Sequence, residues 1–255
     1  MGRMAAAGAT HPGKVRPQNE DGLLVNPELG LFAVADGMGG HKAGEVASAL
    51  TLETILAFIT SAAQGDDQTW PFGVESTLDA AGNQLRTAVK LANRRVFNES
   101  ESHEQYTGMG TTVAAVLGKL CLATVCAVGD SRVYLIAEAG IQCLTRDDTW
   151  VENLLTQVPG LDRELLATHP MRHVLTSVIG AQNDVDVTVT SHELMKGERV
   201  VLCTDGVHGA LADVEIGAIV RRAKSVQAAA DELIEAALSA DGRDNLTAVV
   251  VELPR

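Results

Sequence analysis

The chain has 255 residues, of which 46% are hydrophobic and 21% charged, a globular composition that excludes disorder as its main state. Its formal net charge of −13 at pH 7 repels phosphate backbones and anionic lipid, which argues against binding to nucleic acid or to a membrane surface. There is no uninterrupted run of about 18 apolar residues and no apolar N-terminal leader, so a soluble, cytoplasmic protein is expected.

Secondary structure is predicted from the spacing of apolar residues. The first long elements are amphipathic helices over 43–60 and 76–100, which follow a strand at 31–35. Four closely spaced segments rich in β-formers are then expected to be consecutive antiparallel strands, at 111–118, 120–128, 132–137 and 141–145. Further strands are predicted at 185–191, 199–203 and 246–252, with helices at 213–223 and 226–240. This order predicts an α+β layered fold and not alternating βαβ units.

Aspartates recur where the predicted apolar strands end. Asp36, Asp130 and Asp205 each follow such a strand directly, and Asp244 stands just before the last one. Any one of them could be a simple turn residue, because Asp-Gly favours tight turns. If the strands lie side by side, however, the carboxylates gather along one edge of the sheet. Carboxylates so close together need protons or bound cations, and all-oxygen ligation favours Mg²⁺ or Mn²⁺ over zinc.

Other polar residues near these positions are candidates for the same site. Glu20 and Asp21 form an acidic pair that could also be only a charged turn. Arg16 precedes a proline, which favours an extended backbone suited to a bidentate grip on phosphate, although a plain surface side chain is the alternative. Gly37 could offer a carbonyl ligand. His41 lies in a glycine-rich loop and is a candidate general acid, because histidine titrates near neutral pH, but a lone loop histidine is usually just solvated.

Together these motifs resemble those of the metal-dependent serine/threonine protein phosphatases of type 2C, in their bacterial form. The matching segments follow the family's order and are VRPQNED (15–21), ADGMGGHKAGEVAS (35–48), GMGTT (108–112), VGDSR (128–132), LTSVIG (175–180), LCTDGV (202–207) and GRDNLTAVVV (242–251). The resemblance implies a four-layer α-β-β-α sandwich of two antiparallel sheets flanked by helix pairs. It also implies a single catalytic domain over 1–255, with a mobile flap within 145–180.

The resemblance further implies two Mn²⁺ or Mg²⁺ ions at one end of the sandwich. Asp36 resembles the carboxylate that bridges both ions, and Gly37 resembles a carbonyl ligand to one of them. Asp205 and Asp244 resemble ligands of the other ion.

More roles follow from the same resemblance. Glu20 resembles an acidic residue that reaches a metal directly or through water, with Asp21 beside it. Asp130 resembles a ligand of a third, weaker metal site described in bacterial members. Arg16 resembles the phosphate-binding arginine, and His41 resembles the general acid.

Some positions depart from the family's pattern. Bacterial members commonly have Asp-His-Ser after the Leu-Thr that ends the fourth strand of the expected meander, whereas this chain has Asp148 in place of the histidine, and Thr204 replaces a usual serine. None of the expected metal ligands is lost. His169 and His173 are four residues apart, but a zinc pair there is not expected, because an HPMRH segment is commonplace in the family.

The expected reaction is hydrolysis of phosphoserine and phosphothreonine by direct attack of a water that bridges the two ions, without a covalent phosphoenzyme. The expected partners are phosphoproteins, substrates of a serine/threonine kinase, and the chain is expected to be a monomer. Two alternatives stay open. One is a catalytically silent phosphatase-like domain, which would not need to retain five separated acids, and the other is a small-molecule phosphomonoesterase that uses the same ions.

Overall fold

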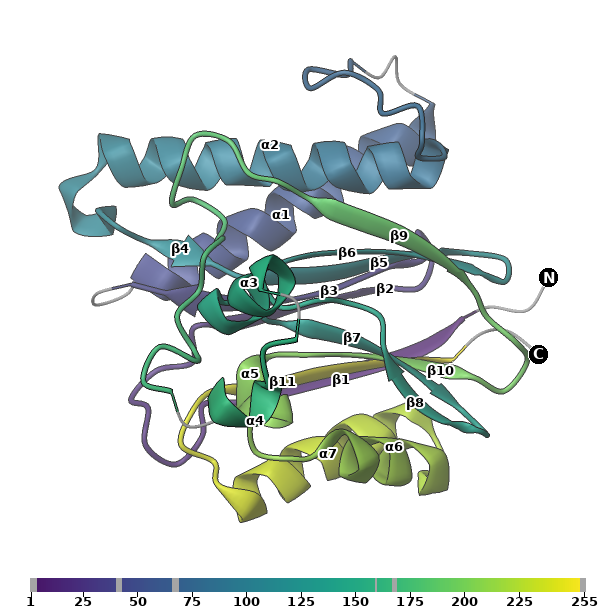
Figure 1. Ribbon diagram of the computed structural model, residues 1–255. Helices are drawn as coiled ribbons and strands as arrows, with labels where there is room; N and C mark the ends of the chain where they lie inside the picture. The colour runs from purple at the N-terminus through teal and green to yellow at the C-terminus, as the bar shows by residue number, and fades with distance from the viewer. Residues whose placement is uncertain (1–3, 40–42, 66–68, 159, 167–168, 253–255) are drawn as a thin grey trace.

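Two antiparallel β-sheets stack face to face, and helices cover the outer face of each sheet (Figure 1). The computed structural model describes residues 4–39, 43–65, 69–158, 160–166 and 169–252. One sheet, called sheet A, contains in spatial order β1 (Ala5–His11), β11 (Leu246–Glu252), β10 (Arg199–Cys203), β7 (Arg132–Ala137) and β8 (Gly140–Cys143). The other, sheet B, contains β2 (Asp21–Asn26), β3 (Leu31–Met38), β5 (Val113–Lys119), β6 (Leu122–Val128) and β9 (Thr188–Glu193), with β4 (Gly110–Thr111) paired to β3.

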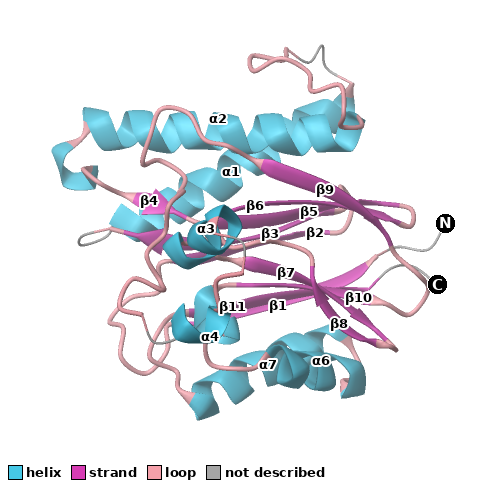
Figure 2. Cartoon of the chain, viewed as in Figure 1, coloured by secondary structure: helices cyan, strands magenta, loops and turns pink. Residues whose placement is uncertain are grey.

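The long helices form the two outer layers (Figure 2). Sheet B is covered by α1 (Ala43–Gln64) and α2 (Ala80–Ser102), and sheet A by α6 (Asp213–Arg222) and α7 (Val226–Ala240). The shorter helices are η1 (Glu104–Tyr106), α3 (Trp150–Gln157), α4 (Arg163–Leu166) and α5 (Asp205–His208). This arrangement confirms the predicted α+β fold, a four-layer α-β-β-α sandwich, and all four predicted long helices.

The start of α2 differs from the predicted one for a local reason. The helix begins at Ala80 rather than at residue 76, because Asp79 is its N-cap: the Asp79 side chain accepts the Gly82 N–H at 2.7 Å. Such a cap satisfies one of the N–H groups that have no partner inside the first turn of a helix. The apolar spacing therefore predicts the helix, and the cap fixes where it starts.

Strand β3 shows how one segment serves two layers of the core. Leu31, Ala33 and Ala35 pack in the cluster under α1 and α2, while Phe32 and Val34 lie in the cluster between the two sheets. Side chains alternate between the two faces of a strand, and here both faces are buried. The strand therefore has a continuous run of apolar residues rather than an alternating pattern.

Helix α1 has 22 residues and a mean hydropathy of 1.6 in its most apolar window, enough to cross a membrane by length and composition alone. Its residues Ile55 and Ile59 are buried in the cluster that α1 shares with α2 and sheet B. The apolar character of α1 is therefore explained by its place in the core of the fold.

The prediction of four consecutive antiparallel strands between residues 111 and 145 is wrong. β5 pairs with β6 in sheet B, and β7 pairs with β8 in sheet A, so the chain crosses from one sheet to the other between Val128 and Arg132. Gly129 makes this crossing possible with a φ of +96°, and a Cβ atom there would lie 2.6 Å from the Thr112 side chain. A short Gly-Asp-Ser connection suggests a hairpin locally, but this backbone conformation sends the next strand into the other sheet.

The segment 144–187 between β8 and β9 contains α3 and α4 and is otherwise mostly loop (Figure 2). A β-bridge between Thr149 and Leu175 joins its two halves. The expected flap within 145–180 falls in this segment, and its mobility stays a prediction. The strand expected at 185–191 begins at Thr188.

Candidate active site

The two sheets present acidic residues to a shared cavity of about 250 Å³ at one end of the sandwich. Seven of the residues singled out in the sequence line it: Arg16, Glu20, Asp36, Gly37, Asp130, Asp205 and Asp244. Asp21 lies directly behind this wall, because it is the partner of Asp36 in the register of β2 and β3. His41, the candidate general acid, lies outside the described residues.

The acids come from different parts of the fold, so the condition that their strands lie side by side in one sheet is not met. Asp36 lies in β3 of sheet B. Asp205 follows β10 and Asp244 precedes β11, and both of these strands belong to sheet A. Asp130 lies in the crossing between the sheets. The two sheets end at the same level of the sandwich, and this brings together acids that one sheet alone would not collect.

Gly37 permits the close packing behind the cavity. A Cβ atom at this position would lie 2.1 Å from the Gly44 carbonyl oxygen and 2.6 Å from that of Glu20. The Gly37 N–H donates to the Glu20 carbonyl at 3.2 Å, and the Ser48 hydroxyl donates to the same carbonyl at 2.7 Å. The loop that carries Glu20 is therefore held against both β3 and α1, and a larger residue at position 37 would separate them.

Burial and mutual repulsion disturb the titration of these acids. Burial, with the nearby Asp21 and Asp205, raises the pKa of Asp36 well above its ordinary value. Burial raises the pKa of Asp21 to about 7, against hydrogen bonds from threonine side chains that lower it. Burial, followed by the charge of Asp205, raises the pKa of Asp130 to about 7. The cluster therefore favours either protons or a compensating positive charge.

The donor set fits divalent cations. Asp21 Oδ1 and Asp205 Oδ1 are buried and make no hydrogen bond within the described part of the chain, although buried carboxylate oxygens normally have a partner. As placed, no three His, Cys, Asp or Glu side chains among the described residues are grouped closely enough to hold a metal ion. The acids therefore border a cavity, and they would have to draw together around an ion.

Among the described residues, Arg16 is the one arginine or lysine that lines this cavity. Its Nη2 atom donates to Asp244 Oδ2 at 2.7 Å, and 53% of its side chain is exposed. This pairing raises the pKa of Arg16 through the hydrogen bond and the charge of Asp244, so the guanidinium stays positive. The contact uses one of five N–H donors, which leaves others for an anionic ligand.

Sequence reasoning missed the residues that hold the acids in place. Asn245 Oδ1 accepts the Glu20 N–H at 2.8 Å, and its Nδ2 donates to the carbonyls of Pro12 and Gln18 at 2.9 Å each. Asn245 thereby fixes the loop that carries Arg16. Its place directly after Asp244 was the available signal, but its contacts are more than 200 residues away in the chain.

Thr112 and Ser131 connect the two sheets behind the acids. The Thr112 hydroxyl accepts the Asp36 N–H at 3.1 Å and lies 2.7 Å from the Ser131 hydroxyl. Ser131 follows Asp130 directly, so one chain of hydrogen bonds joins the crossing segment to β3. Both residues are buried, with 1% exposure each.

The two histidines of the HPMRH segment take different places. His169 stacks on Trp150, with ring centroids 4.8 Å apart, while His173 lines the cavity together with Leu175. Neither belongs to a group of metal ligands within the described residues. No local pattern in the sequence pointed to His173 as a cavity residue.

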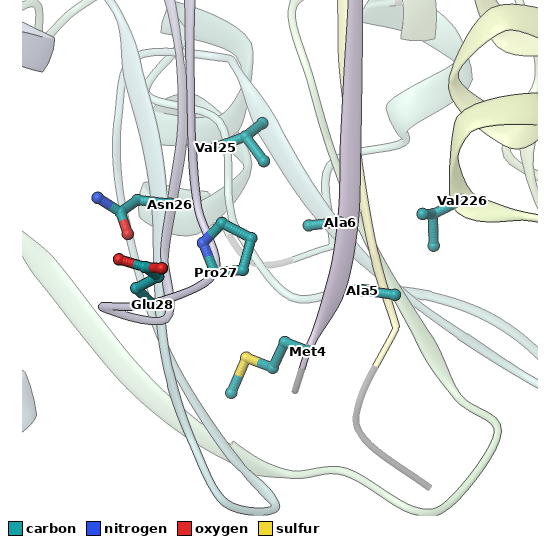
Figure 3. A pocket seen from close by; sticks show the side chains of 8 residues that line it. All are labelled: Met4, Ala5, Ala6, Val25, Asn26, Pro27, Glu28 and Val226. Atoms are coloured by element: carbon teal, nitrogen blue, oxygen red, sulfur yellow. The ribbon is translucent and has the colours of Figure 1, made fainter. Parts of the chain in front are cut away.

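A larger hollow of about 570 Å³ lies at the opposite ends of β1 and β2 (Figure 3). Its described lining is mostly apolar, with Met4, Val25, Pro27 and Val226, and Glu28 is the one acidic residue in it. These described residues form no group of titratable side chains for catalysis. The smaller acidic cavity is therefore the candidate active site.

The raised pKa of Asp130 predicts how metal-free stability depends on pH. Below about pH 4 the carboxyl group is protonated in both the folded and the unfolded state. Between about pH 4 and 7 the folded state retains a proton on Asp130 that the unfolded state loses. The stability that this bound proton gives to the folded state is lost as the pH rises through 7. Asp130→Asn stays neutral throughout and is expected to gain stability relative to the unchanged protein, by on the order of a few kcal/mol at pH 8.

Urea unfolding in EDTA at pH 5 and at pH 8 measures this difference. Asp231→Asn is the matched control, because Asp231 is exposed on α7, lies outside the cavity and contacts the exposed side chain of Gln227. A difference between Asp130→Asn and the unchanged protein that does not vary with pH would contradict the raised pKa.

Comparison with known proteins finds the same family by sequence and by structure. A family model described as Protein phosphatase 2C matches residues 8–249. The serine/threonine protein phosphatase PstP of Mycobacterium tuberculosis is 34% identical over 241 residues, which are 94% of this chain and 43% of that protein. The serine/threonine phosphatase stp of Listeria welshimeri is 29% identical, over 98% of this chain and 96% of its own length. This chain thus spans less than half of the mycobacterial relative but nearly all of the Listeria one.

Solved structures agree with the sequence comparison. The crystal structure of the Mycobacterium tuberculosis phosphatase PstP/Ppp superposes with a TM-score of 0.85 and 32% identity, covering 99% of this chain and 100% of that one. The catalytic domain of PstP in complex with two manganese ions superposes with a TM-score of 0.82 and 30% identity, covering all of both chains.

Proposed function

The chain belongs to the protein phosphatase 2C family, and we propose that it hydrolyses phosphoserine and phosphothreonine in proteins with two bound Mn²⁺ or Mg²⁺ ions. The observation that carries this proposal is the acidic cavity: acids from both sheets surround it, two buried carboxylate oxygens beside it have no hydrogen-bond partner among the described residues, and Arg16 lies among them. A single cavity thus combines groups for cations with a group for phosphate.

Named residues would hold the ions. Asp36 would contact both ions, the Gly37 carbonyl would contact one of them with Glu20 nearby, and Asp205 and Asp244 would contact the other. Asp130 would hold a third, weaker ion together with Asp205. When bound, the ions would supply positive charge next to the phosphoryl oxygens and make a water acidic enough to attack phosphorus at neutral pH.

The protein's own groups would bind and orient the substrate. Arg16 would donate to the phosphoryl oxygens while its contact with Asp244 holds its orientation. His41 is proposed as the proton donor to the leaving serine or threonine oxygen, on its position in the sequence. A direct attack by water needs no covalent phosphoenzyme, and no cysteine lines the cavity among the described residues.

The proposal extends to the substrates, the oligomeric state and the cellular location of the protein. Phosphoproteins made by a serine/threonine kinase would be the substrates, and the protein would act as a cytoplasmic monomer. The intact set of acids favours an enzyme over a silent binding domain, because a domain without activity would not need them. A small-molecule phosphomonoesterase would use the same groups, so substrate choice has to be measured.

The test compares substrate classes under the same conditions. The purified chain is expected to release phosphate from phosphoserine and phosphothreonine peptides when Mn²⁺ or Mg²⁺ is added, and excess EDTA is expected to stop it. Sugar phosphates and nucleotides at equal concentration are the controls, and the proposal expects slower turnover of both. Faster turnover of a sugar phosphate would favour the phosphomonoesterase, and undiminished turnover in EDTA would contradict metal dependence.

A further inference from the structure

Asp148 lies where the crossing segment that carries Asp130 meets the segment 144–187. The two residues Gly129 and Asp148 bind each other twice: the Gly129 N–H donates to Asp148 Oδ2 at 3.0 Å, and the Asp148 N–H donates to the Gly129 carbonyl at 2.8 Å. One of these bonds uses the Asp148 side chain and the other uses its backbone. The position of Asp130, one residue further, is therefore tied to Asp148.

The same residue holds the opposite wall of the cavity. The Asp148 carbonyl accepts the Thr176 N–H at 2.7 Å and the Thr176 hydroxyl at 2.9 Å. The Trp150 N–H donates to the Val174 carbonyl at 2.9 Å. His173 and Leu175, which line the cavity, stand in the stretch that these bonds fix.

The neighbours of Asp148 are anchored separately. Arg132 binds Asp147 through two hydrogen bonds, Nε to Oδ1 at 2.9 Å and Nη2 to Oδ2 at 2.7 Å. On the other side of Asp130, Ser131 is held by Thr112. Arg132–Asp147 and the Thr111–Ile179 bridge also connect these parts of the fold, but the Asp148 contacts reach the residue directly before Asp130 and the stretch 174–176 at the same time.

We propose that Asp148 is a positioning residue that fixes Asp130, on the metal-binding wall, relative to residues 173–176, on the substrate-facing wall. The proposal rests on the proposed function for its catalytic consequence, but the mechanical link is a property of the fold itself. It also gives a physical role to the residue that replaces the histidine common in the family. The Asp148 side chain acts as a hydrogen-bond acceptor for Gly129, so a neutral acceptor of the same shape is sufficient.

Hydrogen exchange measures the link without any substrate or metal. In EDTA, Asp148→Ala is expected to exchange faster than the unchanged protein in two separate peptides, 126–133 and 172–178. Asp148→Asn keeps an acceptor oxygen and is expected to restore protection in both. The expected increase at each site is roughly 2- to 12-fold, the fold-change that corresponds to one hydrogen bond.

Perturbing the link from the other side gives a reciprocal test. Thr176→Val removes the hydroxyl that donates to the Asp148 carbonyl and accepts from Asn153 Nδ2 at 2.8 Å, and Thr176 is exposed, so the variant is expected to fold. Faster exchange in 126–133 in this variant would show that the effect travels through Asp148. Asp184→Ala is the control, because it removes an aspartate of the same 144–187 segment that contacts Lys90 instead.

Metal dependence supplies the catalytic readout. Asp148→Ala is expected to raise the Mn²⁺ concentration for half-maximal activity and the KM for a phosphopeptide together, each by roughly 2- to 12-fold, with Asp148→Asn close to the unchanged protein. Asp130→Ala removes the proposed metal ligand itself and therefore gives the largest expected increase in the Mn²⁺ concentration for half-maximal activity.

Each outcome decides the proposal. Faster exchange in only one of the two peptides, or no rescue by asparagine, would overturn it and leave Asp148 with a local structural role. The proposal would also be overturned if Asp148→Ala increased exchange in peptide 126–133 and Thr176→Val left exchange in that peptide unchanged. If the unchanged chain hydrolyses no phosphopeptide, the proposed function fails, while the exchange experiment still decides the link.

Discussion

Asp36→Asn is expected to lower phosphatase activity by on the order of 10³-fold or more, the rate change that corresponds to several kcal/mol of lost charge stabilisation. Asp36 lies in β3, where burial and, after it, the charges of Asp21, Asp205 and Asp130 raise its pKa. If Asp36 holds both proposed ions, an amide at this position would be a much weaker ligand for either. The loss is then expected even at saturating Mn²⁺, because added metal would not restore the missing carboxylate.

The same substitution is expected to leave the metal-free fold intact. The backbone of Asp36 provides its structural contacts, because its N–H donates to the Thr112 hydroxyl and its carbonyl accepts from Thr112 and Thr111. Asparagine retains these bonds and removes a buried group that can become charged. Thermal unfolding in EDTA at pH 8 should therefore give a Tm equal to or higher than that of the unchanged protein.

Metal binding separates this explanation from misfolding. Added Mn²⁺ is expected to raise the Tm of the unchanged protein, because a ligand that binds only the folded state stabilises it, and to raise that of Asp36→Asn much less. Asp231→Asn, which changes an exposed aspartate of α7 outside the cavity, is the matched control and should behave like the unchanged protein. Normal activity of Asp36→Asn, or the same Mn²⁺-induced rise in Tm, would remove Asp36 from the centre of the site.

How much of the fold could be predicted depends on how local the signal is. The spacing of apolar residues was sufficient for α1, α2, α6 and α7, because each helix buries one face and exposes the other. Strand β1 has the sequence AAAGATH, which lacks β-branched apolar residues and was not predicted. It is a strand because it pairs with β11 along its whole length, and its own sequence does not carry that information.

In the candidate site, too, local features could be predicted from the sequence and long-range contacts could not. The Asp-Gly and Asp-Asn motifs identified the acids, because a carboxylate next to a strand end is visible in the sequence. Their arrangement was not visible, since Gly129 sends the chain from sheet B to sheet A between β6 and β7. The residues that fix the acids, such as Thr112 and Asn245, act through contacts between segments that are distant in the sequence. Local motifs therefore predict the chemistry of the site and leave its support to the tertiary structure.

His41 can be tested through the leaving group, although it lies outside the described residues. p-Nitrophenolate departs readily without a proton, whereas the alkoxide of serine does not. If His41 donates the proton, His41→Ala should lower kcat on a phosphoserine peptide far more than on p-nitrophenyl phosphate. General-acid assistance typically contributes about 10²–10⁴-fold, so the difference between the two substrates should be of that order.

His173 offers the control for this experiment, because it is the histidine that lines the cavity among the described residues. His173→Ala removes an imidazole from the same site, and it is expected to change the two substrates by similar factors if His173 contacts substrate without donating a proton. Equal losses on both substrates in His41→Ala would exclude His41 as the proton donor. A selective loss on the phosphopeptide in His173→Ala instead would assign that role to the 144–187 segment, and the general acid would then come from the substrate-facing wall rather than from the loop after Asp36.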